Sequence, residues 1–250
     1  MSDRLAHLRR YRGRYLAAIL LLILGGISIL LYSGSYFDRD PFTRYPATGR
    51  VQPVLVLSLS GDMGLRYGMS GVVARQLSAN GIPVLGVNSP VLFREHRTHE
   101  QVDALIADLI RQAAREADGR RLVLLGQSYG ADMLQTGLAR LPADLRARVS
   151  ALILVVPGRT AYFRSDPSGL AYMGRPDSLG ITTARTLDWL PVTCIYGVEE
   201  PDSLCPLLKL PNAHVVAMPG GHYMNHDDPA LVAHVLAAIA GQPLSAAAMR

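Results

Sequence analysis

The sequence predicts an α/β fold with a doubly wound, mostly parallel sheet, and three observations support this prediction. Short apolar runs alternate along the chain with segments of helical spacing. The runs are apolar on both faces, as expected of parallel strands that helices cover on both sides. The 250 residues, 49% of them hydrophobic, suffice for one large domain with a sizeable core. No stretch repeats at a fixed spacing, which argues against a repeat protein.

The net charge of +5 is concentrated at the N-terminus. Residues 1–14 carry one acidic residue, Asp3, against five arginines: Arg4, Arg9, Arg10, Arg12 and Arg14. The rest of the chain is therefore close to neutral. This nearly neutral part of the chain lacks the basic surface that binds phosphate backbones, and we expect no nucleic acid among its partners.

An uncharged, apolar segment follows this basic leader. Residues 15–37 are long enough and apolar enough to cross a bilayer as a helix. We expect residues 1–14 in the cytoplasm, 15–37 as a transmembrane signal anchor in the inner membrane, and the remainder in the periplasm. A cleaved signal peptide is the alternative, because Ser33, Gly34 and Ser35 are small. The apolar region is long for a secretory signal, which favours a retained anchor.

The body of the chain follows a polar, proline-containing stretch at 38–51, which predicts a linker to a single domain at 52–250. Thr98 opens one helix with Gln101 three residues on, a capping-box arrangement. Residues 157–191 form either a lid over a site or a long crossover with one short helix. The expected strands are 54–59, 82–87, 122–125, 151–156, 192–196 and 214–218, and further helices are expected at 71–79, 131–141 and 229–240.

The chain has only two cysteines, Cys194 and Cys205, and both follow the apolar segment. In an oxidising compartment they can pair, which would contribute roughly 2 to 3 kcal/mol on the chain-entropy model. Two buried thiols are the alternative. No histidine lies at zinc-ligand spacing from either cysteine, and the sequence implies neither a metal nor an organic cofactor.

One motif carries chemistry. Residues 126–130 read Gly-Gln-Ser-Tyr-Gly, a G-x-S-x-G pattern between a predicted strand and a predicted helix, as the nucleophile elbow of α/β-hydrolases requires. Ser128 would then project from the carboxyl end of the sheet at a helix N-terminus, where backbone N–H groups favour a developing oxyanion. The sequence thus predicts an α/β-hydrolase-like sheet with Ser128 as an acyl-transferring nucleophile.

A serine nucleophile needs a histidine base, and the histidine needs a carboxylate to orient it. The expected chain order is serine, acid, histidine. His222 follows the sixth strand and two glycines and is the leading base, with His226 as a substitute. For the acid, Glu200 has the usual offset from the strand-end glycine, whereas Asp202 has the commoner side chain. We slightly favour Asp202.

Two further roles are expected around Ser128. The oxyanion donors map to the backbone N–H groups of Tyr129 and Asp62. Asp132 lies one helical turn beyond Ser128, and we hypothesise that it helps receive a substrate ammonium group. Bracing the elbow helix is an equally good explanation of Asp132.

These residues resemble the VirJ/AcvB family of bacterial virulence proteins over about residues 52–240. The resemblance rests on five segments: LSGDMG (59–64), RTHEQ (97–101), LLGQSYGADML (124–134), CIYGVEEPDSLC (194–205) and PGGHY (219–223). The chain departs from the family pattern at Met63, Gly64 and Leu65, where a second glycine and a tryptophan are usual, and at His99, where proline is usual.

The resemblance implies a periplasmic serine hydrolase that removes the amino acid from aminoacylated phosphatidylglycerol, notably lysyl-phosphatidylglycerol. It also implies a link with virulence and type IV secretion, and hence secretion-system proteins as partners. Two other functions remain open. One is a non-catalytic envelope module that binds such partners, and the other is a general esterase or lipase.

Overall fold

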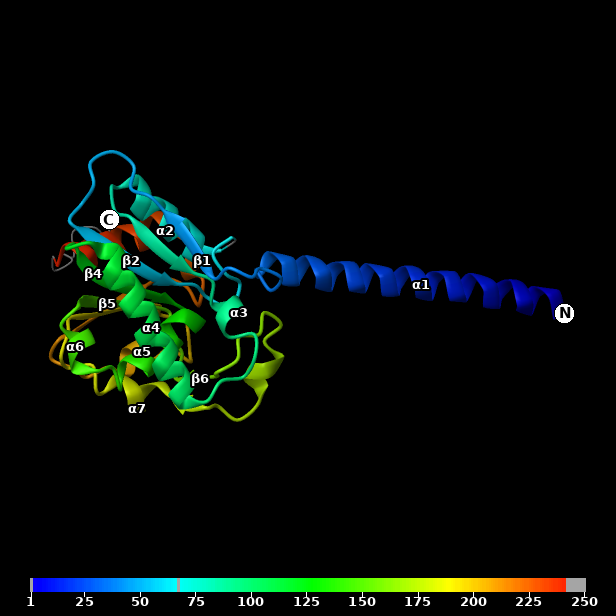
Figure 1. The fold of residues 1–250 in the computed structure, drawn as a ribbon. Helices are drawn as coiled ribbons and strands as arrows, with labels where there is room; N and C mark the ends of the chain where they lie inside the picture. The colour runs from blue at the N-terminus through cyan, green and yellow to red at the C-terminus, as the bar shows by residue number, and fades with distance from the viewer. Residues whose placement is uncertain (1, 67, 242–250) are drawn as a thin grey trace.

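The computed structural model describes residues 2–66 and 68–241, with side chains described from residue 12 onward (Figure 1). Met1 of the predicted leader and residues 242–250 of the predicted domain lie outside the described residues. A seven-stranded sheet occupies the centre of the domain. Its strands are β1 (Phe42–Tyr45), β2 (Val54–Leu59), β3 (Val84–Val87), β4 (Arg121–Gln127), β5 (Val149–Val155), β8 (Val192–Gly197) and β9 (Ala213–Met218).

The strand order is β1-β3-β2-β4-β5-β8-β9, and all neighbours are parallel except β1, which pairs antiparallel with β3 at one edge. From β2 the chain adds β3 on one side and then, in sequence order, β4, β5, β8 and β9 on the other side, as in a doubly wound sheet. This topology confirms the predicted fold class, and each of the six predicted strands is present.

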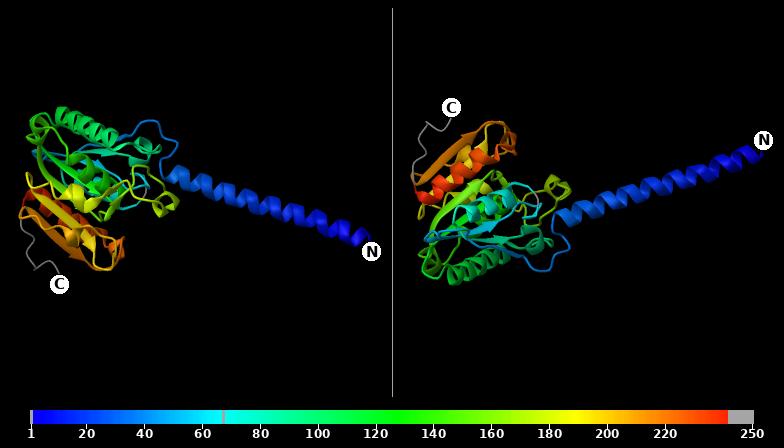
Figure 2. Two further views of the ribbon diagram at one scale, coloured as in Figure 1. Left: turned by 90° about the horizontal axis from the view of Figure 1, so that it is seen from below. Right: turned by 90° about the horizontal axis from the view of Figure 1, so that it is seen from above.

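Helices cover both faces of the sheet (Figures 1 and 2). Along β2, Leu55, Leu57 and Leu59 pack into one core, whereas Val54 and Val56 pack into the other. This alternation explains why the strand is apolar throughout. The helices are α1 (Ser2–Ser33), α2 (Met69–Ala79), α3 (Ser89–Leu92), α4 (His99–Ala117), α5 (Tyr129–Leu138), α6 (Ala143–Arg146), α7 (Gly180–Ala184) and α8 (Asp228–Ala240).

The two cores contain different helices. The larger core holds side chains of α4, α5 and α7, and the smaller one holds side chains of α2 and α8. The capping box predicted for α4 is confirmed, because Thr98 and Gln101 exchange both side chain to backbone hydrogen bonds. Three short 3-10 turns complete the chain: η1 (Leu170–Met173), η2 (Cys205–Leu207) and η3 (Met224–His226).

Helix α1 projects away from the domain as a single long helix (Figures 1 and 2). Its part from Arg12 to Ser33 is long and apolar enough to cross a membrane, and none of that window is buried against the domain. An uncleaved anchor and a signal sequence both have this length and composition.

The chain after α1 folds back onto the domain at once. Gly34 and Ser35 are buried, and the Tyr36 hydroxyl donates a hydrogen bond of 2.8 Å to the carbonyl oxygen of Ser165. The guanidinium of Arg66 pairs with the Asp38 carboxylate at 3.2 Å. The end of α1 is therefore held by several contacts.

The predicted linker at 38–51 is wrong in part, because its residues 42–45 form β1. This strand is short and half-exposed at the sheet edge, so it lacks the apolar run that marks the buried strands. Residues 157–191 combine both of the alternatives left open. They form a crossover with one short helix, α7, and a small antiparallel pair, β6 (Thr160–Ala161) with β7 (Ser178–Leu179), and part of the segment also covers the candidate site.

Candidate active site

Ser128 stands in a tight turn between β4 and α5. Its φ of 50° and ψ of −121° are a conformation that side-chain-bearing residues rarely adopt. A Cβ at Gly126 would lie 2.6 Å from the Ala131 Cα, and a Cβ at Gly130 would collide with the carbonyl oxygen of Leu59. The two glycines therefore allow the strand and helix to approach closely enough for the turn to form.

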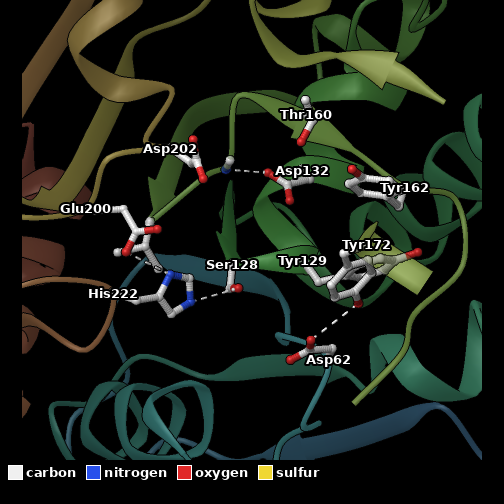
Figure 3. A pocket seen from close by; sticks show the side chains of 12 residues that line it. Asp62, Ser128, Tyr129, Asp132, Thr160, Tyr162, Tyr172, Glu200, Asp202 and His222 are labelled. Carbon is white, nitrogen blue, oxygen red and sulfur yellow. Dashed lines mark hydrogen bonds and ion pairs between the residues drawn. The ribbon is translucent and has the colours of Figure 1, made fainter. Parts of the chain in front are cut away.

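His222 lies against this serine. Its Nε2 is 3.0 Å from the Ser128 Oγ, and its Nδ1 is 3.3 Å from Glu200 Oε2 (Figure 3). The three side chains follow the carboxyl ends of β4, β8 and β9, which run parallel and therefore end at the same edge of the sheet. Serine, histidine and carboxylate thus form a continuous chain of polar contacts, the arrangement that nucleophilic acyl transfer needs.

The preference for Asp202 as the acid is wrong, because Glu200 contacts the histidine. Within the loop after β8, the Glu200 N–H donates to the Gly197 carbonyl at 3.0 Å. The Glu199 N–H donates to the Gly220 carbonyl at 2.9 Å and so ties this loop to the one after β9, which carries His222. Asp202 is exposed two residues further on, beside the cavity.

The substitute base His226 is also not at Ser128. Its ring is exposed and stacks on Tyr223 with 5.4 Å between ring centroids. The sequence order alone could not separate the two histidines. The turn after the two glycines directs only the first of them back towards the elbow.

The predicted oxyanion loop lies next to the nucleophile. A Cβ at Gly61 would be 3.6 Å from the Ser128 Cβ, and the Gly61 N–H donates a 3.2 Å hydrogen bond to the hydroxyl oxygen of Ser70. Tyr129 begins α5, so its backbone N–H belongs to the first turn, which has no partner within the helix. The arrangement supports the N–H groups of Tyr129 and Asp62 as donors, an assignment that stays a prediction.

A cavity of about 280 Å³ opens beside Ser128 and is lined by acidic and tyrosine side chains (Figure 3). Its lining comprises Asp62, Ser128, Tyr129, Asp132, Val156, Gly158, Thr160, Tyr162, Tyr172, Glu200, Asp202 and His222. A second cavity of about 170 Å³ lies between the loop at 61–64, the start of α2 and the His222–Tyr223 turn, and it shares Ser128 with the first. The serine therefore stands between two separate spaces.

Two carboxylates in the larger cavity are largely enclosed. Asp132 accepts a 2.8 Å hydrogen bond from the Gly158 N–H, and burial raises the pKa of its carboxyl well above the usual value. Asp62 accepts a 3.3 Å hydrogen bond from the Tyr172 hydroxyl, and burial raises its pKa too. No arginine or lysine of the described residues forms an ion pair with either.

The tyrosines form one wall of this cavity. The Tyr129 and Tyr172 rings are stacked with centroids 6.3 Å apart, and Tyr162 lies 5.3 Å from Tyr172. The Tyr129 hydroxyl is buried and has no hydrogen-bond partner among the described residues. The sequence alone assigns no role to the tyrosines of 157–191, because nothing local predicts that this segment folds over the elbow.

The Cys194–Cys205 disulfide is confirmed. It joins the middle of β8 to the start of η2, and so closes the loop that carries Glu200 and Asp202. Both cysteines are fully buried.

Similar structures share this fold. One of them is Est1E from Butyrivibrio proteoclasticus, with 17% identity over 78% of this chain and 92% of that chain and a TM-score of 0.55. XC6422 from Xanthomonas campestris, an α/β serine hydrolase without a lid, has 18% identity over 83% and 93% and a TM-score of 0.52. A lipase-esterase related protein from Clostridium acetobutylicum has 11% identity over 80% and 100% and a TM-score of 0.58. The fold is therefore that of the α/β-hydrolases.

A search of curated proteins found no match. The family model described as bacterial virulence protein (VirJ) matches residues 53–242, which include the elbow, the acid loop and the histidine turn. The chain belongs to the VirJ family of bacterial virulence proteins, as the sequence resemblance indicated.

Proposed function

We propose that this chain is a membrane-anchored, periplasmic serine hydrolase that cleaves the aminoacyl ester of aminoacylated phosphatidylglycerol. The observation that carries the proposal is the acidic, tyrosine-walled cavity beside Ser128. Enclosed carboxylates without a cation of their own favour a positively charged acyl group, and tyrosine faces favour the same charge. A lysyl ester carries two ammonium groups and fits this description.

In the proposed reaction, the Ser128 Oγ attacks the ester carbonyl while the His222 Nε2 takes its proton. The ester bond then breaks, and the phosphatidylglycerol hydroxyl leaves with that proton. The aminoacyl group stays on Ser128 until water, deprotonated by His222, releases the free amino acid and restores the serine. Glu200 holds the imidazole in orientation, and the backbone N–H groups of Tyr129 and Asp62 stabilise the oxyanion.

Asp132 has a place in this proposal. One of its carboxylate oxygens braces the crossover through the Gly158 N–H, and the residue also lines the cavity. An entering ammonium would offset the cost of enclosing the carboxylate, the same cost that raises its pKa. We therefore propose that Asp132 both braces the site and receives the substrate cation.

A membrane location supports a lipid substrate. The part of α1 from Arg12 to Ser33 has the length and composition of a spanning helix, and the basic leader occupies the beginning of the same helix. Gly34 and Ser35 of the weak cleavage site are buried against the domain, which favours retention of the anchor. The second cavity beside Ser128 offers a separate space for the departing glycerol group.

The test is hydrolysis of labelled lysyl-phosphatidylglycerol in vesicles by the purified full chain. We expect release of lysine by the wild type and none by Ser128→Ala. Cleavage of simple esters alone would favour a general esterase. Cleavage of neither ester, in a folded protein, would favour a non-catalytic envelope module, for which secretion-system partners are the prediction.

A further inference from the structure

The turn η1 lies at the end of the domain from which α1 leaves, and it carries apolar side chains in solvent. Leu170 is 69% exposed and Met173 81% exposed. We propose that these two side chains enter the lipid surface beside α1 and form a second membrane contact. This inference rests on the membrane anchorage proposed above and adds the surface by which the domain meets the bilayer.

Figures 1 and 2 show the η1 segment protruding on the side of the domain from which α1 emerges. A Cβ at Gly34, directly after α1, would lie 3.3 Å from Pro167, and the Tyr36 hydroxyl binds the Ser165 carbonyl. The residues 165–167 that lead into η1 therefore pack against the first residues outside the helix, at the depth where a bilayer surface begins in the proposed anchored state.

Single exposed apolar residues are common on soluble domains, but Leu170 and Met173 share their end of the domain with Phe37, which is 63% exposed. The charges around these side chains are mixed, because each of the exposed residues Arg39, Arg164 and Arg175 lies within two positions of an aspartate. The place of these apolar side chains beside α1 favours lipid as their partner, because a spanning helix would bring them to the bilayer surface.

The same turn reaches the active site on its inner side. Tyr172 lies between the two exposed residues in sequence, yet its ring points into the cavity (Figure 3). Its hydroxyl donates to the Asp62 carboxylate at 3.3 Å and accepts from the Asp166 N–H at 2.9 Å. A lipid contact at η1 would thus hold one wall of the acidic cavity at head-group level, where an aminoacyl lipid presents its ester.

The experiment measures lipid contact directly in the full chain, reconstituted in phosphatidylglycerol nanodiscs with brominated acyl chains. For Met173→Trp we expect at least about a two-fold loss of tryptophan emission relative to unbrominated lipid, as for a side chain that enters the head-group and acyl boundary. The wild type, whose only tryptophan is Trp189, gives the background. Val51→Trp is the matched control, because Val51 is 55% exposed in the loop between β1 and β2, away from α1.

Equal quenching in Met173→Trp and Val51→Trp would overturn the inference. A second variant, Leu170→Asp with Met173→Asp, tests its consequence. We expect kcat/KM for bilayer-borne lysyl ester to fall about ten-fold, because two apolar contacts are replaced by charges, while kcat/KM for a water-soluble lysine ester stays unchanged.

An equal fall on both esters would mean that η1 serves the cavity alone and would also overturn the inference. Quenching in a chain whose wild type cleaves no aminoacyl lipid would leave the membrane contact standing and remove the proposed function. A tryptophan emission of Met173→Trp that lipid bromine does not quench, but that shifts when a secretion protein is added, would replace the lipid by a protein partner.

Discussion

Ser128 shows how far individual residues of the site can be predicted from sequence. The elbow is local: strand, two glycines and helix occupy adjacent positions, and the turn geometry leaves few alternatives. The acid is not local. Its choice depends on how the loop after β8 folds against the histidine turn, and backbone hydrogen bonds between those loops, invisible in the sequence, select Glu200 over Asp202.

The first prediction concerns this pair of carboxylates. We expect Glu200→Gln to lower kcat by about 10³- to 10⁴-fold, because an amide no longer holds the histidine in the productive tautomer. Asp202→Asn, the matched control, should change kcat less than about ten-fold, the factor that corresponds to 1.4 kcal/mol. Steady-state kinetics on a soluble lysine ester measures both, and the reverse order would return the role to Asp202.

A second prediction concerns Asp132. We expect Asp132→Asn to lower kcat/KM for a lysyl ester about 10- to 100-fold relative to a neutral N-acetylated ester, because a charged hydrogen bond is lost. The amide oxygen still accepts the Gly158 N–H, so the brace survives. An unchanged ratio between the two esters would leave Asp132 as a brace alone.

The same substitution should stabilise the fold in a pH-dependent way. The Asp132 carboxyl has a higher pKa in the folded chain than its unfolded value of about 3.9, so the folded state loses stability as the pH rises through the interval between them. At neutral pH we expect Asp132→Asn to raise Tm by about 2 to 4 °C. Below about pH 3.9 the Asp132 carboxyl is protonated in both the folded and the unfolded wild type, so the difference in Tm between variant and wild type should vanish. Thermal unfolding in detergent at several pH values measures it.

At the scale of elements, the buried strands were predictable and the edge strand was not. Strands β2, β4 and β5 are enclosed on both faces, so each needs a run of apolar residues that is legible in the sequence. Strand β1 pairs only with β3 among the described strands and stays half-exposed, so its side chains need not be apolar. The same reasoning explains the crossover, whose short elements depend on contacts with α5 and the cavity wall more than on their own periodicity.

The disulfide carries the third prediction, because it closes the loop that bears Glu200. We expect Cys194→Ala with Cys205→Ala to lower the free energy of unfolding by roughly 2 to 4 kcal/mol. It should also lower kcat more than it raises KM, because a looser loop orients the histidine less well. In a Glu200→Gln background, the two cysteine substitutions should leave kcat unchanged. A further fall in kcat in that background would mean that the disulfide acts through another part of the site. Denaturant titration and kinetics give the two readouts.

At the scale of the whole molecule, the sequence predicts the apolar helix and the domain, with a linker between them. In the structure the residues after α1 pack on the domain without a break, and Arg66 reaches back to the Tyr32 carbonyl and the Asp38 carboxylate. Such long-range contacts have no signature in composition, because polar, proline-containing stretches occur in free linkers and in docked segments alike. These contacts therefore hold the domain in one orientation relative to α1.

This docking has a kinetic consequence in the proposed anchored state. Enzyme and lipid would be confined to one plane, and each encounter would come from lateral diffusion within a single leaflet. Turnover would then follow the mole fraction of substrate in that leaflet, and diluting the vesicles in buffer would leave the rate per enzyme unchanged.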